Sequence, residues 1–371
     1  MGINEIIVSI VIGFFCIGAI DNIMGSRWGI GERFTEGFMT MGSLTLAMVG
    51  IISLAPVLAS LLTPVVAPIY SVVGADPASF ANTLLALDME GYSLATEMSQ
   101  SKDAERFAWV FLGTMMGPTL AFTIPVALSI ISKEDHKYFA KGILLGLITV
   151  PVGCLVGGMV AGLDLLVIVT NLIPPIFLSV IISIGLLKYT DKMIAGFAVF
   201  AKGIQVVAII GLAAISVETF TGVVIIPNMT PLVEGIEIVA KIAVFLAGAF
   251  PLVTFLSFVL KKPLNKIGAL LGMNDVSTAG LIASLAHNIP MLSLLKDMNP
   301  RGKVINVAFA VSGAFVLGSH LGFVAGVVKE IVFAMIVGKL VGGISAVLLA
   351  VLVTRNKSET NKLATIWGRV R

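Results

Sequence analysis

Two carboxylates and an aromatic hydroxyl interrupt an apolar stretch near residue 90. Asp88, Glu90 and Tyr92 lie between the runs FANTLLAL and SLATEM, with Gly91 among them. Ionisable side chains inside a membrane-like segment are costly, so they point to a functional site. Unwinding at Gly91 would let Asp88 and Glu90, which diverge on a regular helix, face one cavity that attracts a cation or shares a proton. Tyr92 adds a ring face and a hydroxyl. The alternative, a loop tip at the membrane surface, is disfavoured by the apolar runs on both sides.

A second polar interruption occurs where His287-Asn288-Ile289-Pro290 separates TAGLIASLA from MLSLL. Pro290 removes a backbone donor and disturbs the helical ladder. The amide oxygen of Asn288 can accept a hydrogen bond from an ammonium or a hydroxyl. His287 either lines the same cavity or is a packing histidine with one satisfied hydrogen bond. Two interrupted segments at matching places in a chain are the best sequence pointer to a transporter's binding site.

Two more polar residues align when the two halves of the chain are compared. The run MGPTLAF, which contains Thr119, lines up with LGSHLGF, which contains His320. Both residues are therefore candidates for lining the cavity, with Phe122 and Phe323 as its walls. For Thr119, a hydrogen bond to the preceding helical turn is the favoured interpretation. For His320, a functional role and a packing role stand about equal.

The composition is that of a polytopic membrane protein. Of the 371 residues, 57% are hydrophobic and 12% charged, and the mean hydropathy is +1.05, whereas soluble proteins carry about 25% charged residues. The net charge of +3 is small and gives no nucleic-acid surface. Cys16 and Cys154 have no metal or redox spacing. No HExxH, GxSxG, Walker A or Rossmann fingerprint occurs in a fitting context, so we expect no enzyme.

The elements that must position these residues are membrane-spanning helices of about 20 residues. We expect an all-α, polytopic transmembrane helical bundle of about nine such helices, near 3–24, 38–58, 105–131, 142–162, 165–187, 193–215, 236–260, 303–328 and 331–354. The interrupted segments, 76–99 and 275–296, are expected as broken or re-entrant helices; if both cross fully, eleven helices span. The stretch 56–74, with three prolines, cannot continue one straight helix and is expected to be bent or interfacial.

The basic residues predict how the chain is oriented. They fall in six clusters, at Arg27/Arg33, Lys133/Lys137/Lys141, Lys188/Lys192, Lys261/Lys262/Lys266, Lys296/Arg301/Lys303 and Arg355/Lys357/Lys362/Arg369/Arg371. If the interrupted segments re-enter, all six clusters lie on the cytoplasmic side, the N-terminus outside and the C-terminus inside. If the segments cross, three clusters move outside. The positive-inside rule therefore favours re-entry, with Lys102/Arg106 as the main exception.

The order of elements predicts an inverted internal repeat. Span, broken segment, glycine-rich span and span occur in both halves, and in the re-entrant arrangement the two halves have opposite orientations. We therefore divide the chain into a first membrane repeat (1–163), a connecting transmembrane helix (164–189), a second membrane repeat (190–355) and a basic cytoplasmic tail (356–371).

Long runs of the sequence resemble one known family. These are MGINEII, EGFMTMGSLTLAMVGIISLAPVLA, LLALDMEGY, GTMMGPTLAFTIPVAL, VPVGCLVGG, LLKDMNPRGKVINVAF and GSHLGF, and they are similar to the ethanolamine-utilisation permease family, EutH. The resemblance covers essentially the whole chain. It implies a multi-pass protein of the bacterial cytoplasmic membrane that brings ethanolamine to a cytosolic ammonia-lyase pathway. It also implies an acidic site residue at Asp88.

The candidate residues fit this substrate. Ethanolamine is a small ammonium with one hydroxyl, so a carboxylate such as Asp88 can pair with the ammonium while Asn288 or a histidine takes the hydroxyl. Membrane lipid and the substrate are the expected partners, and no cofactor is expected.

Several alternatives remain open at this stage. The chain is a carrier with alternating access, a channel-like facilitator of ethanolamine or ammonia, or a cation-coupled transporter of another small cationic or polar solute. A membrane enzyme or pathway scaffold is the alternative of a different class. The sequence leaves open whether a proton or sodium ion accompanies the substrate and whether the chain forms a homo-oligomer.

Overall fold

The protein is a bundle of helices. The computed structural model describes residues 2–85 and 91–354, and every regular element within them is a helix. Eight helical stretches of this described part are long and apolar enough to cross a membrane: Ile3–Ile23, Gly31–Ser71, Lys102–Ala127, Lys133–Val160, Leu165–Lys188, Ala195–Thr221, Leu232–Leu270 and Lys329–Val353. The predicted all-helical, multi-pass membrane protein is confirmed.

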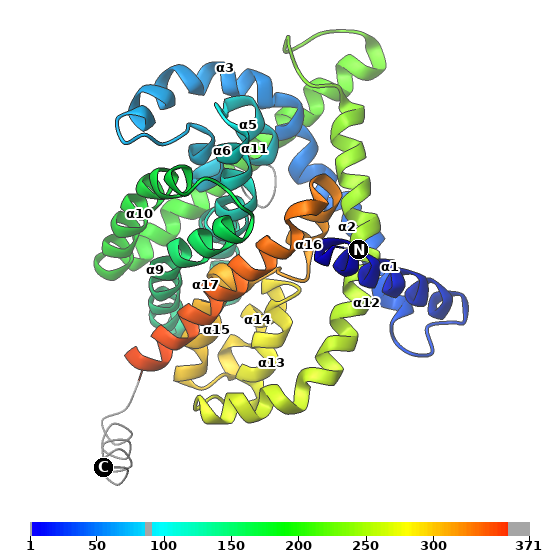
Figure 1. The fold of residues 1–371 in the computed structure, drawn as a ribbon, viewed down its shortest axis with the longest axis vertical. Coiled ribbons are helices and arrows are strands. Elements are labelled where there is room, and N and C mark those ends of the chain that lie inside the picture. Colours follow the sequence, from blue (N-terminus) through cyan, green and yellow to red (C-terminus); the bar gives the residue numbers. More distant parts are fainter. Residues whose placement is uncertain (1, 86–90, 355–371) are drawn as a thin grey trace.

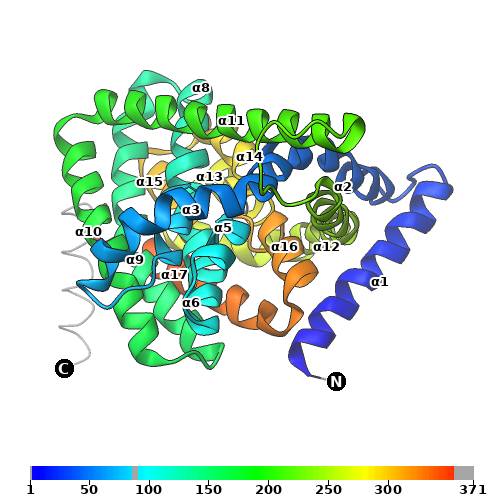
Figure 2. The same cartoon turned by 90° about the horizontal axis from the view of Figure 1, so that it is seen from above.

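The long helices form the outer part of the molecule. They are α1 (Ile3–Ile23), α2 (Gly31–Leu44), α3 (Gly50–Ser71), α9 (His136–Val160), α10 (Leu165–Lys188), α11 (Thr190–Thr221), α12 (Leu232–Leu270) and α17 (Val332–Val353). A π-helical turn, η1 (Thr45–Val49), joins α2 to α3. Figure 2 shows α1 at one edge of the molecule and α10 at the opposite edge, with α5, α14 and α16 between them.

The proline-rich stretch after residue 56 is helical. Helix α3 contains Pro56, Pro64 and Pro68 without ending at any of them. Figure 1 shows it arching across the top of the molecule, away from α2. The expectation of a bend is met, because each proline removes one backbone donor and disturbs the preceding turn while the helix as a whole continues.

Short helices fill the interior. The first interrupted segment contains α4 (Ala78–Phe80), the π-helical η2 (Ala81–Leu85) and α5 (Gly91–Met98); the second contains α13 (Asp275–Ser284), α14 (Asn288–Leu294) and the 3₁₀ turn η6 (Leu295–Asp297). The expected span 105–131 consists of α6 (Lys102–Arg106), π-helical η3 (Phe107–Leu112), α7 (Gly113–Met115), π-helical η4 (Thr119–Thr123) and α8 (Ile124–Ile130). The 3₁₀ turns η5 (Lys133–Asp135) and η7 (Lys329–Ile331) precede α9 and α17.

One expected span, 303–328, is not a continuous helix. Helix α15 (Pro300–Gly313) ends before residues 314–318, and α16 (Ser319–Val327) begins after them. Phe315 has φ +60°, a left-handed conformation that interrupts the helix. The backbone N–H groups of Phe315 and Leu317 donate to the carbonyl oxygens of Ser284 and Leu285, at 3.0 and 2.9 Å, so the main chain here is paired with the second interrupted segment.

Helices α9, α15 and α17 form a closely packed group because small residues face one another. A Cβ added at Gly153 of α9 would lie 2.7 Å from the carbonyl oxygen of Gly338 in α17, and one added at Gly157 would lie 3.0 Å from the Cα of Gly338. Glycines at such positions let helix backbones approach directly, as is common in membrane bundles.

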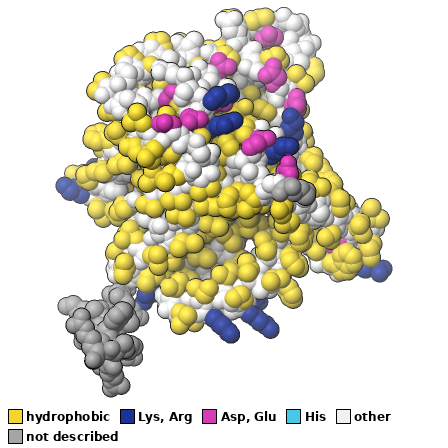
Figure 3. All heavy atoms as spheres, in the orientation of Figure 1, with side chains coloured by type: hydrophobic (Ala, Val, Ile, Leu, Met, Phe, Trp, Pro, Cys, Tyr) yellow, Lys and Arg dark blue, Asp and Glu magenta, His cyan; other side chains and the backbone are white. Residues whose placement is uncertain are grey.

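The surface agrees with a membrane environment. Figure 3 shows hydrophobic side chains over a broad belt of the face in view, with acidic side chains gathered in its upper part. Large apolar side chains such as Phe177, Phe220 and Phe258 are 69%, 82% and 82% exposed, which is favourable in lipid and costly in water. The division into two inverted repeats with a connecting helix stays a prediction.

Candidate functional site

The first interrupted segment turns back on itself. The carboxylate of Asp76, at its start, accepts hydrogen bonds from the backbone N–H groups of Ala78 (2.9 Å) and Gln100 (2.8 Å), and Gln100 lies at its end. The side-chain oxygen of Asn171 in α10 accepts from the N–H of Asp76 (2.9 Å) and the hydroxyl of Ser79 (2.6 Å). The two ends are therefore fastened together, and we call residues 76–100 the first hairpin.

A hydrogen bond also joins the two arms of the first hairpin. Asn82, buried in η2, donates from Nδ2 to the carbonyl oxygen of Gly91 at 3.0 Å. The residues between these arms include Asp88 and Glu90, which lie outside the described residues. Burial raises the pKa of the Asp76 carboxyl, although the hydrogen bonds that it accepts from backbone N–H groups act in the opposite direction. The charged form of Asp76 is therefore unfavourable at this position.

The second interrupted segment has the same closed form. Asn274, at its start, donates from Nδ2 to the carbonyl oxygen of Asp297 at 3.0 Å. Asn299, just after its end, donates from Nδ2 to the carbonyl oxygen of Gly272 at 2.7 Å. Residues 274–299 therefore form the second hairpin, anchored by two asparagines in place of the aspartate of the first.

The tip of the second hairpin carries two of the predicted site residues. His287 is the N-cap of α14, and its Nδ1 accepts from the N–H of Ile289 at 3.1 Å. Its ring lies 4.9 Å from that of Phe315 and 6.0 Å from that of Phe122, measured between centroids. His320 of α16 lies 4.9 Å from Phe315 on another side. We call Phe122, His287, Phe315 and His320 the aromatic cluster.

Asn288 connects the two halves of the chain. It is 1% exposed, and its Nδ2 donates to the hydroxyl of Thr123 in η4 at 2.9 Å. Its Oδ1 has no hydrogen-bond partner among the described residues. A buried amide oxygen without a partner is costly, at about 1–3 kcal/mol, and is the kind of group that a ligand donor can satisfy.

Thr119 and Tyr92 lie beside this cluster. The Thr119 hydroxyl donates to the carbonyl oxygens of Met115 (2.9 Å) and Val311 (3.3 Å), so the favoured local hydrogen bond is present. The Tyr92 ring lies 5.1 Å from Trp109 and 5.7 Å from Phe323, edge to face. Because Phe323 and His320 are three residues apart on α16, the Tyr92 contacts and the aromatic cluster meet on one helix.

The structure thus gathers five predicted residues, Tyr92, Thr119, His287, Asn288 and His320, around η4, α14 and α16. The expected wall residues Phe122 and Phe323 both contact them. Their predicted role in binding is a separate matter and stays a prediction.

Sequence reasoning missed other polar residues of the interior. For Asn82 and Thr123, the only clue in the sequence was a polar residue within an apolar run. Lys339 is 1% exposed in α17, and its position at the centre of an apolar span was a usable signal. Lys303 and Asp135 form a buried ion pair that joins the start of α15 to the turn before α9.

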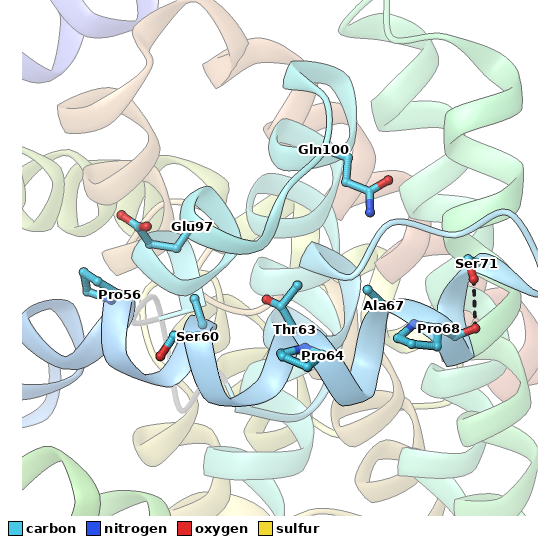
Figure 4. A pocket seen from close by; sticks show the side chains of 10 residues that line it. Pro56, Ser60, Thr63, Pro64, Ala67, Pro68, Ser71, Glu97 and Gln100 are labelled. Carbon is cyan, nitrogen blue, oxygen red and sulfur yellow. Dashed lines mark hydrogen bonds between the residues drawn. The ribbon is translucent and has the colours of Figure 1, made fainter. Parts of the chain in front are cut away.

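A groove of about 700 Å³ lies on another part of the molecule, between α3 and α5 (Figure 4). Small and polar residues of α3, among them Ser60 and Thr63, form one side, and Glu97 and Gln100 lie across from them. Among the described residues that line the groove, Glu97 is the only charged one. The groove reaches the end of the first hairpin through Gln100, but none of the five gathered residues lines it.

Comparison with known proteins decides the family. Residues 3–353 match the family described as "Ethanolamine utilisation protein, EutH". The chain belongs to the EutH family. It is 56% identical over 362 residues to the "Probable ethanolamine permease EutH" of Listeria monocytogenes, covering 98% of this chain and 97% of that protein.

Two further relatives are also matched over nearly their whole length. The "Probable ethanolamine permease EutH" of Escherichia coli is 43% identical over 401 residues, covering 97% of this chain and 98% of the relative. The "Uncharacterized protein YxeR" of Bacillus subtilis is 59% identical over 358 residues, covering 96% and 97%. No solved structure matches the chain.

Proposed function

We propose that this chain is a permease that imports ethanolamine across the bacterial cytoplasmic membrane. Its membership of the EutH family and the names of two relatives, each a probable ethanolamine permease, support the substrate. Eight apolar helices of spanning length support the membrane location.

The observation that carries the proposed site is the position of Asn288. It lies at the tip of the second hairpin, bonds to Thr123 of the first half, and keeps a buried amide oxygen without a partner among the described residues. Ethanolamine has two donors, an ammonium and a hydroxyl. Either can donate to this oxygen, and the rings of the aromatic cluster offer faces to the ammonium.

Asp88 is proposed to pair with the ammonium, with Glu90 as a second carboxylate of the same segment. Asp88 precedes Tyr92 by four residues, and consecutive Cα atoms are about 3.8 Å apart, which limits its Cα to within about 15 Å of that of Tyr92. A carboxylate–ammonium hydrogen bond contributes about 1.5–3 kcal/mol, whereas a neutral amide in its place contributes less.

The proposed mechanism is alternating access around the two hairpins, with the N-terminus outside and the C-terminus in the cytoplasm. The hydrogen bonds that fasten the ends of each hairpin together support a path in which each hairpin enters and leaves the membrane on one side. In a variant whose Cys16 and Cys154 are replaced, a cysteine at Ser101 should react with an impermeant reagent from outside. A cysteine at Asn299 should react only from inside; equal labelling of both from one side contradicts the inverted arrangement.

The decisive experiment is uptake of labelled ethanolamine by proteoliposomes that contain the purified protein. Wild type should show saturable uptake and counterflow, and Asp88→Asn should lower the uptake rate at least about tenfold, from the loss of a charge-assisted hydrogen bond. Glu97→Gln in the α3–α5 groove is the matched control, because it removes a carboxylate outside the proposed site.

Three results would count against this assignment. If Asp88→Asn takes up ethanolamine as fast as wild type, Asp88 does not bind the substrate. Flux that rises linearly with ethanolamine and shows no counterflow replaces the carrier by a facilitator. If the wild-type protein moves no ethanolamine under any imposed proton or sodium gradient, ethanolamine is not its substrate.

A further inference from the structure

Lys339 is a charged residue inside the bundle that the proposed function does not use. It is the eighth residue of α17, seven residues after the first, which places it about 10 Å along the helix at 1.5 Å per residue. Only 1% of its surface is exposed. A lysine at such a place needs a polar partner, because an ammonium in an apolar interior is costly, and intramembrane charges usually serve a function.

One partner of Lys339 is a carbonyl oxygen for which the helix that contains it has no backbone donor. The Nζ of Lys339 donates to the carbonyl oxygen of Thr114 in α7. In a regular helix the oxygen of Thr114 would accept from the N–H of residue 118, but this residue is Pro118, which has none. The lysine ammonium therefore takes the place of the missing amide hydrogen.

A neighbouring carbonyl is treated in the same way. The N–H of Thr119 donates to Met116 instead of Met115, and the oxygen of Met115 accepts from the Thr119 hydroxyl at 2.9 Å. Two consecutive carbonyls freed at the break, those of Thr114 and Met115, are thus satisfied by two side chains. The two side chains thus complement the backbone hydrogen bonds that Met116 and Leu120 keep at this turn.

Close helix packing fixes where the ammonium can lie. Gly338, adjacent to Lys339, packs directly against Gly153 and Gly157 of α9. With the α17 backbone held at this distance, the apolar stem of the lysine remains in the core and its tip reaches the carbonyl. The donor is therefore held at a fixed depth beside the break.

We infer that Lys339 is a positioning residue for transport. It holds the first-half span broken at Pro118, so that the η4 turn after the break presents Thr123 to Asn288. The effect of Lys339 on transport rests on the proposed function, since Thr123, which it positions, contacts Asn288 of the proposed site. What the site requires of Lys339 is a hydrogen-bond donor at the Thr114 carbonyl.

Four variants separate this role from others. Lys339→Met removes the donor, and Lys339→Gln keeps a donor without charge. Pro118→Ala restores an N–H to residue 118, and Lys339→Met/Pro118→Ala combines the two changes. Lys241→Met is the matched control, because Lys241 is an exposed lysine paired with Glu237 on α12.

Two measurements are made on each variant: ethanolamine uptake, and cross-linking of cysteines at positions 123 and 288 by a short bifunctional thiol reagent. Thermal unfolding in detergent gives the stability of each variant beside them. We expect Lys339→Met to lower maximal uptake and the cross-linking rate at least about tenfold, as a buried carbonyl loses its partner. Lys339→Gln and Lys241→Met should stay within about threefold of wild type. The double variant should regain thermal stability but not uptake or cross-linking, because its span is straightened.

The inference is overturned by any of three results. These are Lys339→Met behaving as wild type in both measurements, Lys339→Gln failing as completely as Lys339→Met, or the double variant regaining uptake together with stability. If Lys339→Met does not fold, Lys339→Gln and the double variant still decide. Cross-linking needs no ethanolamine, so a failure of the proposed substrate leaves this test intact.

Discussion

Two helical runs, 102–130 in the first half of the chain and 300–327 in the second, are interrupted by different means. At Met116–Pro118 the first-half span has π-helical turns on both sides, and its freed carbonyls accept from the side chains of Lys339 and Thr119. At Ala314–Gly318 the second-half span is broken by main-chain pairing, in which two N–H groups donate to carbonyls at the tip of the second hairpin.

The two breaks should therefore be sensitive to different kinds of substitution. The first break depends on side chains, one of which comes from α17 at the other end of the chain, so a single side-chain change should loosen it. The second break depends on backbone atoms within its own half, so it should tolerate side-chain changes and respond to changes that move the backbone. π-helical turns are often found at functional sites, which agrees with the adjustable break being the first.

The largest effect is expected at Gly318, where a substitution tests whether the second break depends on close contact between main-chain atoms. A Cβ at this position would overlap the carbonyl oxygen of Ala286, a backbone atom that cannot rotate away. Gly318→Ala should therefore lower the free energy of unfolding by about 3 kcal/mol. Thermal unfolding in detergent measures the change. Gly203→Ala in α11 is the control, since no atom lies within 4 Å of its added Cβ; equal stability of the two variants would contradict the comparison.

An intermediate effect is expected at Thr123, where the two halves meet. Thr123→Val keeps the shape of the side chain and leaves the buried Nδ2 of Asn288 without its acceptor, which should cost about 1–2 kcal/mol and lower ethanolamine uptake about tenfold. Thr123→Ser retains the hydroxyl and should transport like wild type. Uptake that is the same in the valine and serine variants would show that the hydroxyl is unimportant.

The smallest effect is expected at the hairpin anchors. Asp76→Asn gives the first hairpin the residue type of Asn274, loses one acceptor for a backbone N–H, and removes a buried charge, so the net change at pH 7 should be below about 1 kcal/mol. Because the folded-state pKa of Asp76 is raised, its contribution to stability is greatest at acidic pH and is lost as pH rises through that pKa. Melting temperatures across this pH range should fall for wild type relative to Asp76→Asn; parallel curves would show that Asp76 does not titrate as stated.

The sequence predicted the parts of the fold that depend on composition and local chemistry. Helices of spanning length, the two interrupted segments and the local hydrogen bond of Thr119 follow from hydropathy, from proline and glycine, and from side-chain reach. Aligning the halves singled out Phe122 and Phe323 as wall residues, and each contacts a predicted site residue. Asp88 and Glu90, the first residues singled out, lie outside the described part of the chain.

Other features depend on partners far away in the sequence. The break at residues 314–318 occurs in a glycine-containing apolar run without proline, and only pairing with Ser284 and Leu285 specifies it. Lys339 was visible as a lysine in an apolar helix, but its partner is a carbonyl made available by Pro118, more than two hundred residues earlier. Neither relation leaves a periodic pattern that hydropathy can reveal.

The hydrogen bonds of Asn171 have a consequence for how the protein is made. The first hairpin is anchored by a residue 95 positions after Asp76, whereas the anchors of the second hairpin, Asn274 and Asn299, are 25 positions apart. At about 5–20 residues per second, the ribosome needs roughly 5–20 s to synthesise the chain from Asp76 to Asn171. Both hairpins can therefore close their own ends soon after translation, through Asp76 and Gln100 in the first and Asn274 and Asn299 in the second. The first hairpin, however, cannot dock against α10 until α9 has been synthesised. During biosynthesis, the first hairpin is therefore the later of the two, relative to its own translation, to complete its contacts.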